Sequence, residues 1–180
     1  NEKSPRNTVA EVYAQINTDL DNAITALAGY TRVNKSHFNI DVAKGIKARV
    51  ALTQQNWPDA IKYAKEARAV YPLMTNTQYL AGFNDYTNPE WMWASRIQSD
   101  QTNYFYSFFA YMSSNYNSTA IRTSPKSINS ALYDAIPTTD IRKKLWDPTG
   151  TNKIDFPIPN STASRYKYMS NKFRVADARL

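Results

Sequence analysis

The stretch from Tyr104 to Tyr116 holds the residue types in this sequence that are best suited to binding a ligand. Seven aromatic rings occupy these thirteen positions, and asparagines lie among them and beside them. Aromatic faces pack against the C–H faces of sugars, and tyrosine, amide and guanidinium groups can hydrogen-bond to their hydroxyls. The residues that we expect to contact a ligand are Tyr104, Tyr106, Tyr111, Asn115, Tyr116 and Arg122.

A structural role competes with binding for part of this stretch. Phe105, Phe108, Phe109 and Met112 recur at helical spacing and are typical of a core-facing stripe. This interpretation leaves the tyrosines and asparagines for the surface. Trp91 and Trp93 would share one face of a short strand over 91–97, where they either form a platform or pack against helices.

Other chemistries find little support. The chain has no cysteine and one histidine, His37, which argues against zinc sites and against cysteine nucleophiles. A glycosidase needs two carboxylates about 5–9 Å apart in a cleft. Acidic residues are present, but no spacing singles out a pair, and phosphate-loop, nucleophile-elbow and zinc-protease motifs are missing. We therefore expect no catalytic residue, no metal and no cofactor, and keep a glycan-cleaving enzyme only as a weaker hypothesis.

The positive charge is distributed away from most of the rings. The formal net charge is +7, and residues 121–180 carry eleven basic and five acidic groups. Between Tyr79 and Tyr116 lie 12 of the 24 aromatic residues, but Arg96 is the only basic one there. Proteins that bind single-stranded nucleic acid interleave rings with Lys and Arg, so the sequence gives no direct support for a nucleic-acid partner.

The element that must position these residues is a helical hairpin from Asp41 to Pro72. Asp41 is expected to cap its first helix, and Asn56 and Pro58 to form the turn and open the second. The apolar face of the first helix is expected to consist of Val42, Ala43, Ile46, Val50 and either Ala51 or Leu52, and Trp57 is expected to pack at the turn. Small residues at Ala60, Ala64 and Ala67, followed by a proline, match a tetratricopeptide-type (TPR-like) repeat, although the aromatic and glycine marks of its first helix are missing. An ordinary helical hairpin with an alanine-rich seam is the alternative.

Three further segments have helical signatures. A capping box, Thr8-x-x-Glu11, opens an amphipathic helix that runs to about Ala28. Ser124 and Pro125 predict a helix ending before Pro137, and residues 139–146 predict one or two helical turns. We interpret the basic run Arg142-Lys143-Lys144 in these turns as a solvated helix end, and Asp140 and Arg142 as a local ion pair. A turn follows at 147–150, and a strand is expected near 166–173.

The predicted fold class is mostly α: TPR-like helical hairpins of the α-α superhelix type, with an irregular loop-rich region and one or two short strands. We expect residues 1–180 to form a single segment of a longer protein. TPR-like helices are expected over 8–72, and a loop-rich region that binds the ligand over 73–180. No apolar run approaches the roughly 20 residues that span a bilayer.

Four stretches, in this order, resemble the SusD/RagB family of nutrient-binding outer-membrane lipoproteins. These stretches are NTVAEVYAQINTDLDNAI, the hairpin SHFNIDVAKGIKARVALTQQNWPDAIKYAKEARAVYPL, NPEWMWASRIQ, and LYDAIPTTDIRKKLW with Asp140 and Arg142. The resemblance extends from about Thr8 to Phe173. The lipid-bearing cysteine and the first and last helices of the family have no counterpart, which implies a middle segment.

The resemblance implies a function as well as a fold. It implies non-catalytic binding of a glycan or other nutrient at the bacterial outer surface, beside a SusC-like TonB-dependent transporter. Membrane attachment would come through a lipid anchor outside this segment. Ligand residues vary among family members, so the resemblance assigns none here. The alternative function is a TPR-like scaffold that takes a protein partner along 41–72.

Overall fold

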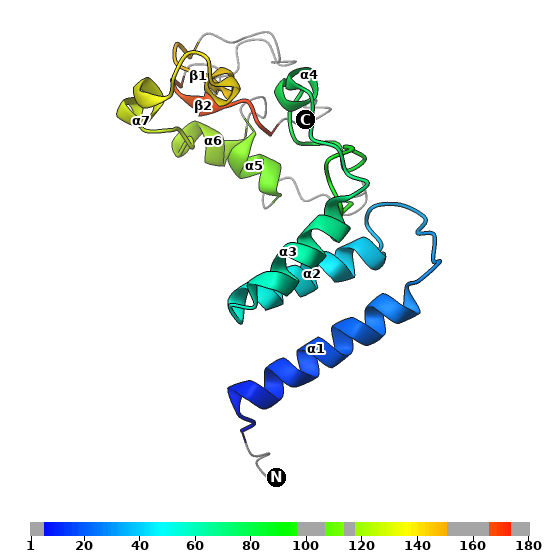
Figure 1. Ribbon diagram of the computed structural model, residues 1–180. Helices are drawn as coiled ribbons and strands as arrows, with labels where there is room; N and C mark the ends of the chain where they lie inside the picture. Colours follow the sequence, from blue (N-terminus) through cyan, green and yellow to red (C-terminus); the bar gives the residue numbers. More distant parts are fainter. Residues whose placement is uncertain (1–5, 97–106, 114–117, 151–165, 174–180) are drawn as a thin grey trace. The chain divides into compact units, whose positions relative to one another are not determined.

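The computed structural model describes residues 6–96, 107–113, 118–150 and 166–173 (Figure 1). Within these ranges the chain is mostly helical, as predicted, with seven α-helices, one 3-10 helix and two short strands. The chain divides into two units. The first comprises Asn1–Leu73 with Tyr86–Arg96, and the second comprises Met74–Asp85 with Ile97–Leu180.

The first unit opens with α1 (Val9–Ala26). Its capping box forms as predicted, because the Thr8 hydroxyl accepts a hydrogen bond from the Glu11 amide and the Glu11 carboxylate accepts one from the Thr8 amide. These bonds hold the pKa of Glu11 below its ordinary value. The helix ends at Leu27, and Gly29 follows with a φ of +76°, a conformation that favours glycine.

The predicted hairpin is present as α2 (Ile40–Thr53) and α3 (Trp57–Arg68), which lie side by side in Figure 1. The predicted cap was wrong. Asn39, not Asp41, caps α2, since its side-chain oxygen accepts from the Val42 amide at 3.1 Å. Asp41 lies in the first turn, where a carboxylate favours the positive end of the helix dipole.

The turn between the two helices also differs from the prediction. Gln55 adopts the left-handed conformation, with a φ of 59°, whereas Asn56 caps α3 by accepting from the Asp59 amide. Pro58 lies in the first turn of α3, as predicted, where its missing N–H is not needed.

The packed face of the hairpin is rotated slightly from the predicted one. Val42, Ala43 and Ala51 are buried as expected. Ile46 is 45% exposed, and Lys47 is buried instead. From α3, Ala60 and Ala67 are buried, while Ala64 is exposed.

Lys47 joins α2 to α1. Its amine donates to the Asp21 carboxylate and lies 4.8 Å from the centre of the Tyr63 ring. Burial lowers the pKa of Lys47, but hydrogen bonds to Asp21 and Tyr63 outweigh it, so the pKa is raised. A second link runs from the Asn17 amide to the Gln54 side chain at 3.0 Å.

Tyr71, which is buried, ties four segments of the first unit together. Its hydroxyl accepts from Arg32 Nη2 at 3.0 Å and from Asn39 Nδ2 at 3.2 Å, and donates to Asp41 Oδ2 at 3.0 Å. The other guanidinium nitrogen of Arg32 donates to the Met92 carbonyl at 2.6 Å. The network joins the loop after α1, the start of α2, the segment just after α3 and the segment 86–96.

Residues 91–96 are not a strand, contrary to the prediction, and Ile97 lies outside the described residues. The segment is held instead by the loop 30–39: the Ala94 amide donates to the Lys35 carbonyl, and the Trp93 indole donates to the Ser36 carbonyl. Trp93 is 46% exposed and stacks on Phe38, with ring centres 5.6 Å apart.

The second unit consists of short elements. These are α4 (Asn76–Leu80), α5 (Phe108–Met112), α6 (Thr119–Thr123), α7 (Ser130–Ala135), η2 (Ile141–Leu145), β1 (Trp146–Asp147) and β2 (Met169–Ser170). The helix predicted from Ser124 starts later, at Ser130, because the Asn129 side chain accepts from the first free amides of α7. The helical turns at 139–146 and the strand near 166–173 are confirmed by η2 and β2.

Ile121 and Met169 form the most deeply buried cluster of the second unit, with Tyr166 packed against it. Gly82 makes a close approach possible elsewhere in the unit. Its φ is +99°, and a Cβ at this position would lie 3.2 Å from the Lys172 carbonyl oxygen. That approach lets the Phe83 amide donate to the same carbonyl at 2.8 Å.

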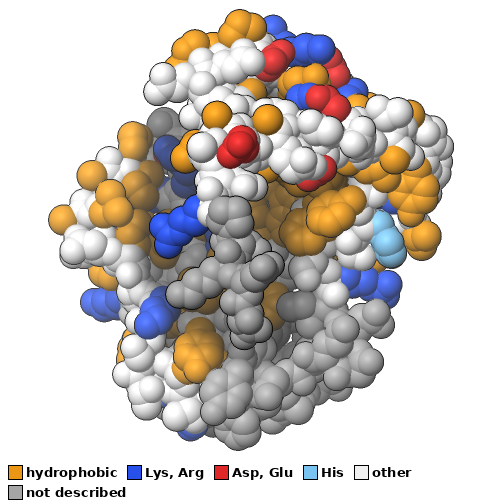
Figure 2. Space-filling model, turned by 90° about the horizontal axis from the view of Figure 1, so that it is seen from below, with side chains coloured by type: hydrophobic (Ala, Val, Ile, Leu, Met, Phe, Trp, Pro, Cys, Tyr) orange, Lys and Arg blue, Asp and Glu red, His pale blue; other side chains and the backbone are white. Residues whose placement is uncertain are grey.

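None of the described helices is both long enough and apolar enough to cross a membrane. In Figure 2, hydrophobic side chains remain on the surface among lysine and arginine side chains.

Candidate ligand-binding cavity

A cavity of about 560 Å³ lies within the second unit. Six of its lining residues come from η2, β1, β2 and the residues just after β2, and the others come from α4, α5, the segment after α6, and α7 with its C-cap. The described lining residues are Tyr79, Met112, Lys126, Ser127, Ile128, Leu132, Ile136, Arg142, Leu145, Trp146, Ser170, Lys172 and Phe173.

The two short strands bring residues from distant parts of the sequence to one wall of the cavity. Trp146 pairs with Ser170 in the antiparallel register, so their side chains project from the same face. Ser127 forms an isolated bridge with Met169, and the Ile128 amide donates to the Tyr168 carbonyl at 3.0 Å. Residues 127, 146 and 170 are therefore neighbours despite their separation along the chain.

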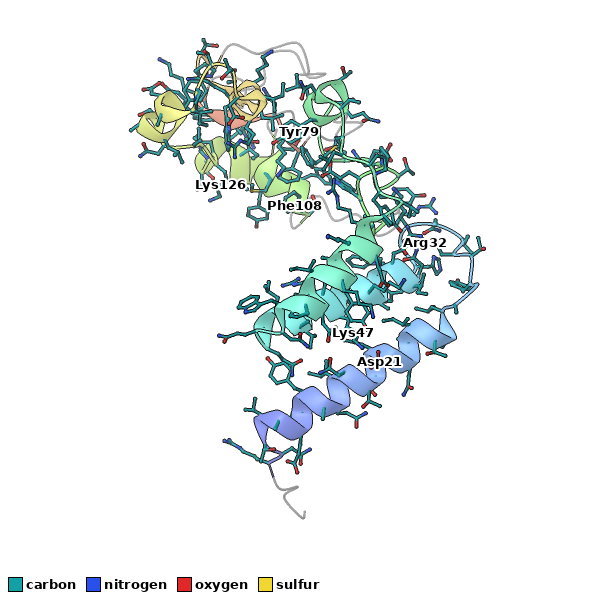
Figure 3. All side chains as sticks on the ribbon, viewed as in Figure 1. Asp21, Arg32, Lys47, Tyr79, Phe108 and Lys126 are labelled. Carbon is teal, nitrogen blue, oxygen red and sulfur yellow. The ribbon has the colours of Figure 1, made fainter. Side chains whose placement is uncertain are left out.

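A chain of aromatic rings includes two residues of the cavity lining, Tyr79 and Phe173. Tyr79 meets Phe83 edge to face at 5.2 Å, Phe83 contacts Phe173 at 6.4 Å, and Phe108 meets Phe173 at 4.8 Å. Such edge-to-face pairs are a favoured arrangement of buried aromatic rings. Figure 3 labels Tyr79 on α4 and Phe108 on α5.

Three cationic side chains line the same cavity. The amine of Lys172 lies 4.5 Å from the Phe83 ring centre and 5.4 Å from that of Phe173. Lys126, labelled in Figure 3, is exposed and comes from the segment between α6 and α7. Arg142 comes from η2 and is 71% exposed.

Arg142 already has a partner. Its Nε donates to both oxygens of Asp140 at 3.0 Å, and its amide donates to Asp140 Oδ1 at 2.9 Å. These bonds lower the pKa of Asp140 from 3.8 to about 2 and raise the pKa of Arg142. The ion pair that the sequence predicted is therefore present, and it fixes the guanidinium at the edge of the cavity.

The cavity combines the groups that sugar recognition requires. Leu132, Ile136 and Leu145 give an apolar surface, Trp146 and Tyr79 give rings, and the serines give hydroxyls. Ligand pockets in general consist of such an apolar lining with a few polar groups that fix orientation. The described lining residues include no Asp or Glu.

The structure places only two of the six predicted contact residues. Tyr111 lies on α5 and is 42% exposed, and Arg122 lies exposed on α6, where its guanidinium donates to the Thr119 hydroxyl. Neither is among the described residues that line the cavity. Tyr104, Tyr106, Asn115 and Tyr116 lie outside the described residues, so the predicted site as a whole remains a prediction.

Trp146, Lys126 and Lys172 were missed by the sequence reasoning. The run Arg142-Lys143-Lys144 was interpreted as a solvated helix end, and the tryptophan two residues after it was the signal that could have directed attention there. The pairing of residues 146 and 170 depends on two-residue strands, which leave no periodic pattern in the sequence.

A second cavity, of about 510 Å³, lies within the first unit on the hairpin. Its lining is almost entirely apolar, and Leu52, Trp57 and Ile61 there are each more than half exposed. Trp57 was expected to be packed, and the structure shows it on the surface instead. Arg49 is the one charged residue among the described lining residues.

Comparisons with known proteins bear on the family. No protein-family model matches the sequence, and no curated protein matches it. A solved structure does match: a SusD-like carbohydrate binding protein from Bacteroides vulgatus ATCC 8482, with 28% sequence identity and a TM-score of 0.71 over 98% of this chain. The fold of this chain is SusD-like. This finding confirms the resemblance that the sequence showed.

The SusD-like chain spans 36% of the length of that solved protein. Because the match includes almost all of this chain, it covers both units, and the mostly helical fold class is shared. That solved protein is a carbohydrate binding protein.

Proposed function

We propose that this SusD-like chain binds an oligosaccharide non-catalytically. The observation that carries the proposal is the cavity of the second unit, whose lining combines Trp146 and Tyr79 with serine hydroxyls and three cations. The likeness to a carbohydrate binding protein supports the same function independently.

Binding would rest on stacking and hydrogen bonding without any covalent step. A pyranose ring presents a C–H face to an aromatic ring such as Trp146, and the burial of both surfaces is favourable. Ser127 and Ser170 offer hydroxyls that can donate or accept, which suits the equatorial hydroxyls of a sugar.

The six residues predicted from the sequence extend this proposal. Tyr111 and Arg122 belong to α5 and α6, in the same unit as the cavity, and we propose them as contacts for a longer oligosaccharide. The four others, Tyr104, Tyr106, Asn115 and Tyr116, stay in the proposal on the strength of their residue types alone.

The setting of the protein is also part of the proposal. By family resemblance, it would work at the outer surface of the outer membrane and deliver its ligand to a SusC-like TonB-dependent transporter. Co-purification of the full-length protein with such a transporter from detergent-solubilised membranes tests this part. Recovery of the protein without any transporter would contradict it.

Calorimetry with a panel of soluble oligosaccharides tests the binding itself. We expect heat of binding from at least one glycan and a loss of at least about tenfold in affinity for Trp146→Ala, because the stacked ring contributes roughly 1.5–3 kcal/mol on burial. Trp146→Phe keeps a ring and should keep most of the affinity. Release of reducing sugar over hours would instead support a glycan-cleaving enzyme.

Trp57→Ala is the matched control. It removes a tryptophan side chain from the first unit, where Trp57 is 55% exposed. Trp57 is not among the described residues that line the cavity of the second unit. We expect unchanged glycan affinity for this variant. If Trp146→Ala retains its melting temperature and still binds glycan normally, the cavity is not the site.

A helical interaction scaffold is the second candidate function. It is favoured by the apolar cavity on the hairpin, whose lining would accept the apolar face of an amphipathic helix. In that case Trp57→Ala should weaken binding of the helix, and Trp146→Ala should not. The two tryptophan variants therefore distinguish the two functions.

A further inference from the structure

We propose that the cavity of the second unit selects acidic glycans, which carry a uronate carboxylate or a sulfate ester. This inference rests on the proposed glycan binding and adds the class of substrate. It comes from the three cations that line the cavity, Lys126, Arg142 and Lys172, and from the lack of any Asp or Glu among its described lining residues.

The two lysines supply the attraction. Within the described ranges, neither Lys126 nor Lys172 forms an ion pair, since no described carboxylate oxygen lies within 4 Å of either amine. The rings beside Lys172 attract its charge without neutralising it. Among the described residues, no carboxylate therefore competes with a ligand for either amine.

Arg142 has a different role. Its guanidinium is committed to Asp140 through three hydrogen bonds to the carboxylate, so its charge is largely compensated. We therefore infer that Arg142 holds the edge of the cavity in place, and that the two lysines recognise the anionic group.

The arrangement favours one anionic group on a sugar over a long polyanion. A single-stranded nucleic acid needs a groove that follows its backbone, with cations at repeated intervals. Here two lysines that form no ion pair with the described residues line one cavity of about 560 Å³, which has the size of an ordinary small-ligand pocket. The aromatic and apolar lining then packs against the sugar ring that carries the charge.

Titration calorimetry with three glycans of equal length tests the inference: a neutral galactose oligomer, its sulfated form, and a galacturonic acid oligomer. We expect at least one acidic oligomer to bind about tenfold or more tightly than the neutral one, as charge-assisted hydrogen bonds allow. Comparison of the two acidic oligomers identifies which anion is preferred. Raising the salt concentration should weaken acidic binding selectively.

Lys126→Met and Lys172→Met locate the effect. Methionine keeps an unbranched side chain while removing the charge, and at position 172 it preserves the contact with the rings of Phe83 and Phe173. Each variant should lose most of the preference for the acidic oligomer and keep its affinity for the neutral one. Lys144→Met is the control, because Lys144 is exposed on η2 but does not line the cavity.

Each adverse outcome has a definite meaning. Equal affinity for neutral and acidic oligomers overturns the acidic preference and leaves glycan binding intact. If the double variant Lys126→Met/Lys172→Met still prefers the acidic oligomers, the assignment of acidic-glycan recognition to this cavity is overturned. Tighter binding of oligothymidylate than of any glycan overturns the ligand class, and the absence of binding by all three glycans overturns the proposed function as well.

Discussion

Replacing Tyr71 with phenylalanine removes one hydroxyl from the centre of the first unit. That hydroxyl takes part in three hydrogen bonds, two of them with the charged groups of Arg32 and Asp41. Phenylalanine keeps the ring, so the packing of the buried side chain is preserved and only the hydrogen bonds are lost.

The expected loss of stability depends on the hydrogen bonds that Arg32 and Asp41 keep in the variant. A hydrogen bond to a charged group contributes about 1.5–3 kcal/mol, but the partners keep other bonds and are reached in part by water. Arg32 retains the Met92 carbonyl, and Asp41 retains the Asn39 amide. We therefore expect Tyr71→Phe to cost about 2 kcal/mol in the free energy of unfolding, close to the loss of one such bond.

Urea denaturation followed by circular dichroism measures this change, and the midpoint should fall while the slope stays constant. Tyr30→Phe is the matched control, because Tyr30 is 47% exposed in the same unit and should change stability by less than about 0.5 kcal/mol. A Tyr71→Phe variant as stable as this control would refute the network.

The pH dependence offers a second measurement on the same pair. Burial, together with the hydrogen bond to Asp41, raises the pKa of Tyr71 above its ordinary value of 10.0. The stability that this shift contributes is complete below pH 10 and is lost as the pH rises through the higher folded-state pKa. The difference in stability between wild type and Tyr71→Phe should therefore shrink at strongly alkaline pH.

Three further contacts can be tested by substitution. Arg142 lowers the pKa of Asp140 to about 2, so the stability from this pair is present above pH 3.8 and lost as the pH falls through 2; acid titrations of wild type and Asp140→Asn should converge there. Asp21→Ala strands the buried Lys47 amine and should cost about 1 kcal/mol in urea titrations, whereas adding Lys47→Met should restore the stability. Gly82→Ala forces a strained φ and a close contact with a carbonyl, and should lower the unfolding free energy by more than about 1 kcal/mol.

The regular helices were the predictable part of the fold. The capping box at Thr8 and the alanine spacing of α3 are local sequence signals. Both helices form where these signals predict them, because hydrogen bonds between residues close in sequence stabilise them. The misplaced caps show the limit of this reasoning. Asn39 and Asp41 are both good caps, and contacts with Tyr71, thirty residues away, accompany the choice between them.

The cavity was not predictable from the sequence, because tertiary contacts assemble it. Trp146 and Ser170 meet through a two-residue ladder, and Tyr79 reaches the same cavity from the other end of the unit's sequence. The charge pattern had placed cations and rings in separate parts of the chain. Folding brings Lys172 over Phe83, which no spacing in the sequence indicates.

Calorimetric titration of wild type, Trp146→Ala and Trp57→Ala with one glycan that binds is the most direct test of glycan binding by the second unit. Our account predicts equal affinities for wild type and Trp57→Ala, and an affinity at least about tenfold lower for a folded Trp146→Ala. Equal glycan affinity in all three proteins, or no heat from any glycan in the panel, would contradict it.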